Sequence, residues 1–122
     1  MNNSQIIQKQ YELIQKENME KIEVRKKTLY DKLPRLKEIE DEMVKLSIDI
    51  TRAILSESHT TEVLIDKLKN KQLDLKVEKA EILSANKYPI DYLDPIYKCK
   101  LCKDTGFVNY QKCKCYKQKE IY

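Results

Sequence analysis

Apolar residues recur at helical spacing along the first two thirds of the chain. The most regular pattern lies in residues 35–56, where apolar side chains follow one another at alternating intervals of three and four, at Leu36, Ile39, Met43, Leu46, Ile50 and Ala53. Such a seam predicts a helix that packs against another helix. Residues 62–85 predict a further helix, with a less regular stripe at Ile65, Leu68, Leu75 and Ile82.

Residues 5–31 predict a long first helix, with Asn3 or Ser4 as its N-cap. Its apolar stripe is interrupted at Asn18 and Arg25. We therefore expect part of this helix to project from the helical bundle or to face a partner. Our candidates for a partner-binding surface are four apolar residues off the main stripe, with packing inside the bundle as the alternative for them: Ile6, Leu13, Met19 and Val24.

Breaks between these segments define the expected connections. Pro34 should end the first helix and fit the first turn of the next. In the polar stretch 56–61, Ser58, Thr60 or Thr61 can cap the third helix, and we interpret His59 as an exposed loop residue rather than a ligand. Asn86 can adopt the left-handed conformation that ends a helix.

Two short connections imply antiparallel neighbouring helices. The expected fold is therefore mainly α: an antiparallel helical bundle or coiled-coil hairpin of about three long helices in residues 1–85, followed by a small module in residues 86–122. Seven of the nine aromatic residues lie between Tyr88 and Tyr122, and we expect these rings to build the core of that module.

All four cysteines of the chain belong to this module, at Cys99, Cys102, Cys113 and Cys115. Two close pairs with the spacing C-x2-C-x10-C-x-C can place four sulfur atoms around one ion, which predicts a closed, structural Zn²⁺ site. Gly106, the only glycine, follows the first pair and tolerates the positive φ that a backbone curling around a metal requires.

Other roles for the cysteines have weaker support in the sequence. Disulfides remain an alternative, but the N-terminus lacks the basic and apolar regions of a secretory signal, so we expect a reducing, cytoplasmic location. A catalytic zinc site would usually include histidine or carboxylate ligands. A redox role for Cys99 and Cys102 lacks the surrounding βαβ pattern, although a redox-sensing thiol switch stays an alternative.

Charge is unevenly distributed. Residues 1–85 hold 16 basic and 16 acidic residues, whereas residues 86–122 hold 8 lysines and 4 acidic residues, so the whole net charge of +4 belongs to the cysteine module. Four thiolates and one Zn²⁺ would reduce it to about +2. The pattern is compatible with weak, salt-sensitive binding of single-stranded DNA, but no base-reading helix is evident.

The sequence argues against an enzyme and against a membrane protein. One glycine cannot build a phosphate-binding G-x-x-x-x-G-K-[ST] loop, and His59 is the only histidine available for nucleophilic catalysis. No apolar run approaches the length that spans a bilayer.

Residues 91–107 read DYLDPIYKCKLCKDTGF, and Cys113-x-Cys115 follows. This run, after a Lys- and Glu-rich helical region, resembles the N-terminal region of bacterial replicative DNA helicase loaders of the DnaC/DnaI type. The specific part of the resemblance is the Cys-x-x-Cys-x-Asp-Thr-Gly-aromatic core with its following Cys-x-Cys. The helical part is similar only in length, composition and the position of Pro34.

The resemblance implies a region that binds the hexameric, ring-shaped replicative helicase, and that precedes an AAA+ ATPase domain in the family. No Walker motif is present before Tyr122, so we expect this chain to be an excised domain and assign it no ATPase activity. The main alternative is a zinc module that binds nucleic acid and carries a helical oligomerisation arm. Self-association through residues 35–56, as in a coiled-coil adaptor, is a further alternative.

Overall fold

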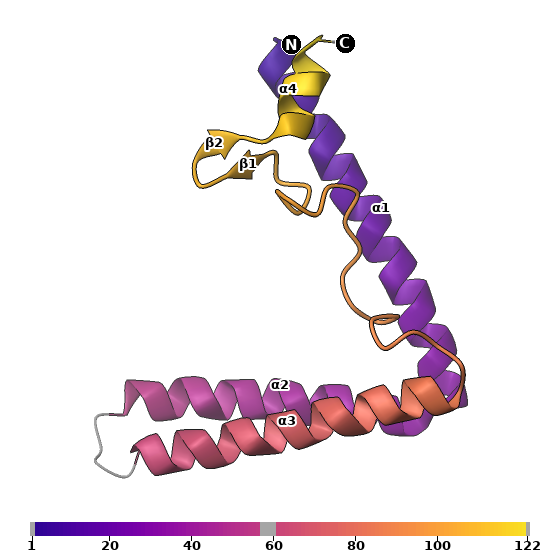
Figure 1. The fold of residues 1–122 in the computed structure, drawn as a ribbon, viewed down its shortest axis with the longest axis vertical. Coiled ribbons are helices and arrows are strands. Elements are labelled where there is room, and N and C mark those ends of the chain that lie inside the picture. Colours follow the sequence, from indigo (N-terminus) through magenta and orange to yellow (C-terminus); the bar gives the residue numbers. More distant parts are fainter. Residues whose placement is uncertain (1, 57–60, 122) are drawn as a thin grey trace. The chain divides into compact units, whose positions relative to one another are not determined.

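The computed structural model describes residues 2–56 and 61–121. Three long helices, α1 (Asn3–Lys32), α2 (Pro34–Leu55) and α3 (Thr61–Ala85), are followed by two short strands and a last helix (Figure 1): β1 (Phe107–Val108), β2 (Gln111–Lys112) and α4 (Lys114–Ile121). The prediction of a mainly helical chain with clustered cysteines is confirmed. Within the described ranges, no helix is both long and apolar enough to cross a membrane.

Contacts divide the chain into two compact units. One unit combines Met1–Arg25 with Leu93–Tyr122, and we call it the cysteine unit; the other, Lys26–Tyr92, is the hairpin unit. The cysteine unit thus includes the first part of α1, which the expected division at residue 85 assigns to the helical region. The division into a helical domain of residues 1–85 and a zinc module of residues 86–122 stays a prediction.

Helix α1 begins at Asn3, so its N-cap must precede both of the expected capping residues. The side-chain oxygen of Asn2 accepts a hydrogen bond from the backbone N–H of Gln5, and the Gln5 side chain accepts one from the N–H of Asn2. This reciprocal pair satisfies two backbone donors that a helix leaves unpaired at its start. Asn2 is therefore the N-cap, and the prediction of Asn3 or Ser4 was wrong.

In the hairpin unit, α2 and α3 pack side by side in antiparallel directions (Figure 1). Pro34 occupies the first turn of α2, as predicted. The α2 seam is buried or half-buried along its length, and Leu36 and Ile39 are almost completely inaccessible. The antiparallel pair agrees with the expected arrangement, while the inclusion of the first helix in a three-helix bundle stays a prediction.

Two polar contacts fix α2 against α3. Gln72, an apparent interruption of the α3 stripe, donates a hydrogen bond to the Ser47 hydroxyl. Arg35 donates two hydrogen bonds to the Glu78 carboxylate, at 2.6 and 2.9 Å. Hydrogen bonds from Arg35 lower the pKa of Glu78. These contacts set the register that the apolar seam alone leaves loosely specified.

Helix α3 ends in a Schellman motif. The N–H of Tyr88 donates to the carbonyl of Leu83, and the N–H of Lys87 donates to the carbonyl of Ser84. Lys87 adopts the left-handed conformation, with φ 64°. The expected left-handed residue, Asn86, instead donates from its side chain to the Ile82 carbonyl. The cap was thus predicted one residue too early, because sequence preference favours Asn over Lys at that position.

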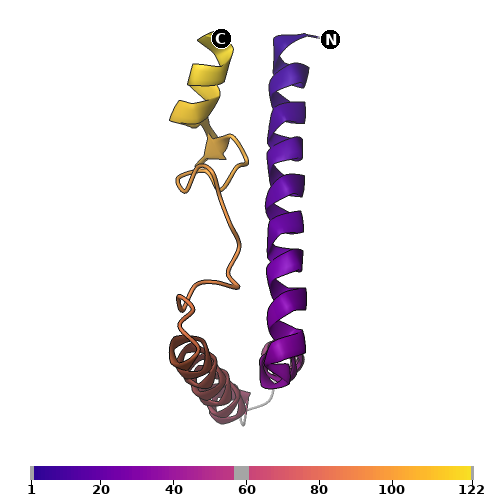
Figure 2. The same cartoon turned by 90° about the vertical axis from the view of Figure 1, so that its right-hand side faces the viewer.

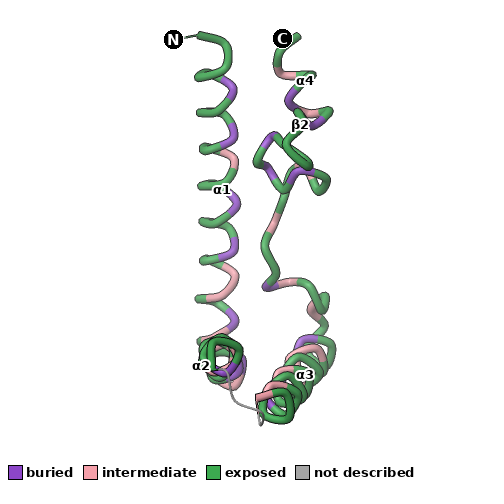
Figure 3. Tube along the Cα trace, turned by 90° about the vertical axis from the view of Figure 1, so that its left-hand side faces the viewer, coloured by how far each residue is buried: buried purple, intermediate pink, exposed green. Residues whose placement is uncertain are grey.

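In the cysteine unit, the first part of α1 lies beside the C-terminal segment (Figure 2). Within residues 2–25, the buried residues of α1 lie on the side of the helix that faces that segment (Figure 3). Its main apolar cluster is small and consists of Ile7, Tyr11 and Tyr116, with half-buried Cys115 packed against it. Ile22 and Leu93 are the other buried apolar residues that the structure describes in this unit besides the cysteines. The expected core of C-terminal aromatic rings was therefore wrong in its membership: Tyr116 is the only aromatic side chain among the described residues 88–121 that is fully buried.

Candidate metal centre

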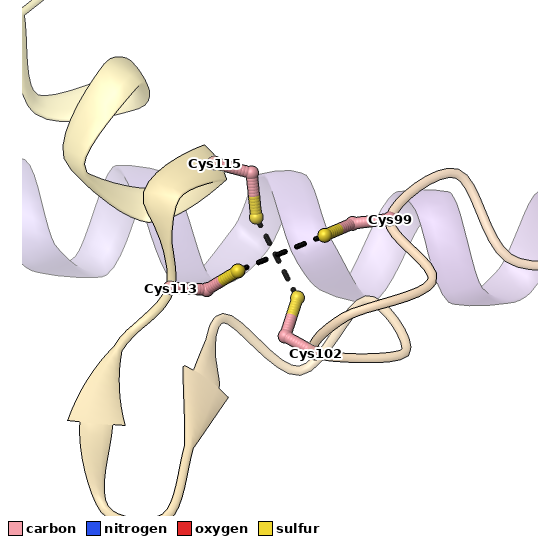
Figure 4. A group of neighbouring side chains, drawn as sticks. All are labelled: Cys99, Cys102, Cys113 and Cys115. Carbon is pink, nitrogen blue, oxygen red and sulfur yellow. Dashed lines mark hydrogen bonds between the residues drawn. The ribbon is translucent and has the colours of Figure 1, made fainter.

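The four cysteine sulfur atoms meet at one point of the cysteine unit (Figure 4). Cys99 and Cys102 come from the loop that precedes β1, Cys113 lies between β2 and α4, and Cys115 lies in the first turn of α4. All four Sγ atoms are within 4.8 Å of one another. The Sγ atoms of Cys99 and Cys113 are 3.7 Å apart, and those of Cys102 and Cys115 are 3.5 Å apart.

These separations fit a metal ion better than disulfides. Four sulfur atoms at tetrahedral corners, each about 2.3 Å from a central ion, lie about 3.8 Å from one another. A disulfide bond would bring two sulfur atoms to about 2.05 Å, and all four cysteines are free thiols. The chain therefore brings together a four-sulfur donor set that is compatible with a metal site.

Left-handed backbone turns bend the chain between Cys102 and β1. Lys103 and Asp104 have φ values of 54° and 60°, and Gly106 has φ 88°. Thr105 secures this turn, because its backbone N–H and its hydroxyl both donate to the Cys102 carbonyl, at 3.1 and 2.6 Å. The N–H of Cys113 donates to the Gly106 carbonyl at 2.8 Å, which ties the two cysteine pairs together.

Gly106 is required for two separate reasons. Its positive φ strains any residue with a side chain, as the sequence predicted. In addition, a Cβ at this position would lie 2.8 Å from Cε2 of Tyr11 and 3.0 Å from Cδ2 of Tyr116. Both distances are shorter than a carbon–carbon contact tolerates. The turn thus needs glycine to let the two tyrosine rings approach the metal-site loop.

Asp104 organises the polar part of the site and is 1% exposed. Its Oδ1 accepts the backbone N–H of Cys99 at 2.8 Å, and its Oδ2 accepts the N–H of Lys98 at 2.9 Å. The side chain of Asn18 on α1 also donates to Oδ2, at 2.8 Å. Asp104 therefore holds the backbone at the first cysteine and links that backbone to α1.

Two further side chains of α1 reach the site. Gln15 donates to the Asp104 carbonyl at 2.7 Å. The hydroxyl of Tyr11 lies 2.9 Å from Cys115 Sγ, and its ring stacks on Tyr116 with centroids 6.1 Å apart. Burial raises the pKa of Tyr11, and its hydrogen bond with Cys115 raises it further. The Tyr11 hydroxyl thus stays protonated and can donate a hydrogen bond to a Cys115 thiolate.

The thiols ionise at different pH values in the absence of a metal. The backbone N–H of Cys102 favours the Cys99 thiolate and lowers the pKa of Cys99 to about 7. Burial raises the pKa of Cys115 to about 12. Because metals bind thiolates, occupation of this site would release protons, and most of all from Cys115.

The structure places the sequence-predicted residues in two groups. The four cysteines come together, whereas the candidate partner-binding residues lie outside the site and are exposed, by 43% at Ile6, 57% at Leu13, 69% at Met19 and 66% at Val24. His59, Ser58 and Thr60 lie outside the described residues, and α3 begins at Thr61.

Sequence reasoning missed the contribution of α1 to this site. The signal in the sequence was the polar Asn18 within the apolar stripe. In the structure Asn18 is only 6% exposed and lies on the inner face of α1, the face that the C-terminal segment covers. Its polarity matches the buried carboxylate of Asp104, which no inspection of α1 alone could reveal. The expectation that this break marks a projecting or partner-facing part of the helix was wrong for Asn18.

No protein-family model, curated protein or solved structure matches this chain.

Proposed function

We propose that the four cysteines bind one structural Zn²⁺ ion, in a cytoplasmic protein. Four thiolates without histidine or carboxylate form a closed donor set, which is typical of structural zinc sites. Thiolates also suit iron and Cu(I). The two pairs of sulfur atoms, 3.7 and 3.5 Å apart, fit a tetrahedral site for Zn²⁺ or iron alike, so metal analysis of the purified chain must distinguish them. Zinc would hold the turn at Gly106, the β1–β2 hairpin and the start of α4 in one arrangement.

We propose further that the chain is the helicase-binding region of a replicative helicase loader. Support comes from the resemblance of the Cys-x-x-Cys-x-Asp-Thr-Gly-aromatic run to the DnaC/DnaI type of loader. The contacts of Asp104, Thr105 and Gly106 give these three residues of the run a role in shaping the cysteine loop. These roles explain the motif but leave the partner to be identified by binding.

The observation that carries this proposal is an exposed apolar stripe on α1. At about 100° per residue, Ile6, Leu13 and Val24 lie on one side of the helix, with the exposed Glu17 and Glu20 between the last two. Tyr11 and Asn18, which contact the metal-site segment, lie well over a quarter turn away. Met19 does not share this side: it lies on the other flank of the face that carries Tyr11 and Asn18. We therefore assign the helicase contact to the stripe of Ile6, Leu13 and Val24, with Met19 as a flanking contact.

A helix that presents such a stripe suits recognition in a groove, where apolar anchors on one face provide most of the binding energy. The inner face of α1 is covered by the C-terminal segment, because Tyr116 of that segment packs with Ile7 and Tyr11 of α1. The site would thus act indirectly, by fixing the segment that covers one face of α1 and leaving the other face accessible.

The test is complex formation between the zinc-loaded chain and the hexameric replicative helicase of the same organism, measured by size-exclusion chromatography with light scattering. Metal content is determined on the same sample, and we expect one zinc per chain. The triple variant Ile6→Ala, Leu13→Ala, Val24→Ala should weaken the complex at least tenfold. The matched control is Leu73→Ala with Val77→Ala, because both residues are exposed on α3.

Absence of a complex at tens of micromolar protein would refute the loader proposal. A complex that the triple variant and the control variant weaken equally would place the interface elsewhere. The double variant Cys99→Ser, Cys102→Ser separates the roles of metal and surface. Retained binding by a variant without zinc would show that the metal site does not shape the helicase-binding surface.

A further inference from the structure

The hairpin β1–β2 has a strained turn at its tip. Its pairs are Phe107 with Lys112 and Val108 with Gln111, so Asn109 and Tyr110 form a two-residue connection. Both have positive φ, 50° and 66°, which defines a type I′ turn. Glycine is strongly preferred at the second position of such a turn, but this chain has tyrosine.

The Tyr110 side chain does not contribute to packing of the fold. It is 103% exposed, the highest value among the exposed large hydrophobic residues of the described chain. The other rings of this region are engaged: Phe107 lies 5.3 Å from Tyr116, and Lys112 lies over the Tyr116 ring. An aromatic side chain in a conformation that favours glycine, with no packing role, suggests a binding function.

Two lysines precede the hairpin in the metal-site loop. Lys100 and Lys103 are exposed, and they form no ion pair within the described part of the chain. Nearby charges are already engaged, because Lys112 pairs with Glu120 and the carboxylate of Asp104 is buried in hydrogen bonds to the backbone. No described acidic side chain pairs with these two lysines, and residues 86–122 keep a net charge of about +2 when the −2 of a Zn²⁺ ion with four thiolates is included.

We propose that Lys100, Lys103 and Tyr110 form a binding site for single-stranded nucleic acid. The lysines would contact phosphates, and the Tyr110 ring would stack on an unpaired base, the combination by which proteins bind single strands without sequence preference. A duplex offers no free base face to this ring. An acidic peptide would satisfy the lysines but would give the ring no role. The inference stands apart from the helicase proposal, because it involves no residue of the α1 stripe.

The experiment measures fluorescence anisotropy of a labelled oligothymidylate of about 20 nucleotides, titrated with the zinc-loaded chain at increasing salt concentration. Tyr110→Gly removes the ring and gives the turn its preferred Asn-Gly sequence, so the fold should not suffer. We expect this variant to bind about fivefold more weakly or worse. Lys100→Gln with Lys103→Asn should make the slope of log binding constant against log salt concentration shallower by about 1.4, the value for two lost phosphate contacts. Asparagine replaces Lys103 because it tolerates the positive φ at that position.

The matched control for charge is Lys67→Gln with Lys69→Gln, two exposed lysines of α3. It should leave the salt slope unchanged. Unchanged binding by Tyr110→Gly, equal loss in the control variant, or no binding at about 100 µM protein in low salt would each overturn the proposal. Equal affinity for a duplex of the same length would also overturn it. Polyglutamate serves as a competitor of the labelled oligothymidylate. If it displaces the oligonucleotide completely, and equally well from Tyr110→Gly, the ligand is an acidic peptide instead.

Discussion

The two units of this chain are stabilised by different interactions. In the hairpin unit, Leu36, Ile39 and Leu83 are buried to 2% exposure or less, and stability comes mainly from apolar packing between helices. In the cysteine unit, the apolar core is a small cluster of Ile7, Tyr11 and Tyr116, with Ile22 and Leu93 buried outside it. Its remaining contacts are polar, centred on Asp104, or belong to the cysteines.

This difference shows why the C-terminal segment must combine with α1. Residues 93–121 bury two large hydrophobic side chains besides the cysteines, Leu93 and Tyr116, which is too little to hold so short a segment in one shape. Metal binding supplies about 10–16 kcal/mol in comparable small domains. The helix adds the remainder of the core and the partners of Asp104. The hairpin unit, by contrast, needs no metal.

The largest effect should follow from loss of the metal ligands. Cys102→Ser with Cys113→Ser, or removal of metal by a chelator, should unfold the segment of residues 97–116, because about 10 kcal/mol or more of binding energy is lost. Hydrogen exchange should show lost protection there and at Tyr11 to Asn18, while α2 and α3 keep their protection. Equal loss of protection in both units would show that the hairpin unit also depends on the metal.

The hairpin unit should respond to a core substitution of its own. Ile39→Ala removes a fully buried side chain and should lower the free energy of unfolding by about 2–5 kcal/mol. Urea denaturation followed by circular dichroism measures the change, and zinc affinity should not change. Ile48→Ala on the same helix is the matched control, because Ile48 is 48% exposed and should cost well under half as much.

The polar centre of the cysteine unit should be nearly as sensitive. Asp104→Ala leaves the N–H groups of Lys98 and Cys99 and the Asn18 amide without their acceptor, so the unit should lose about 3 kcal/mol. A competition assay with a chromogenic zinc chelator should report weaker zinc binding. Asp104→Asn keeps one acceptor and tolerates the positive φ, so a loss as large as that of alanine would argue against the hydrogen-bond explanation.

A smaller effect of opposite sign is expected at the end of α3. Lys87→Gly should stabilise the hairpin unit by up to about 1 kcal/mol, because φ 64° is strained for lysine and favourable for glycine. The midpoint of urea denaturation should rise. As a control, Lys76→Gly inside α3 should destabilise by about 1 kcal/mol, and a stabilisation by both substitutions would be inconsistent with the role of the cap.

The smallest effect concerns pH and Glu40, which accepts hydrogen bonds from Lys26 at 2.9 Å and from Tyr30. Partial burial favours a higher pKa for Glu40, but these hydrogen bonds outweigh it and lower the pKa below its ordinary value of 4.5. The folded state therefore gains stability above pH 4.5 and loses it as the pH falls through the lowered pKa. Glu40→Gln should reduce the loss of unfolding free energy at acid pH, measured by urea denaturation, by less than about 1 kcal/mol. An unchanged pH profile would show that Glu40 does not cause this loss.

The sequence by itself determined the three long helices and the donor set, but not the β1–β2 hairpin or the bounds of α4. Helical periodicity located α2 and α3 closely, and Pro34 marked the boundary between α1 and α2, because these signals act within a few residues. The spacing of the cysteines predicted that their sulfur atoms would meet, and Gly106 was predicted to need positive φ. Each of these features depends on local chain geometry.

Only the tertiary structure decided what lies against the cysteine site. Asn18 appeared to be a defect in an apolar stripe, but it pairs with Asp104, which is 86 positions away in the sequence. Tyr11 likewise contacts Cys115 across 104 positions, and Gly106 is required partly because the Tyr11 ring packs on it. A polar residue on a helix is compatible with solvent or with a buried partner, and only the position of that partner distinguishes them. Contacts between distant segments carry no periodicity, so the pattern along the chain could not predict them.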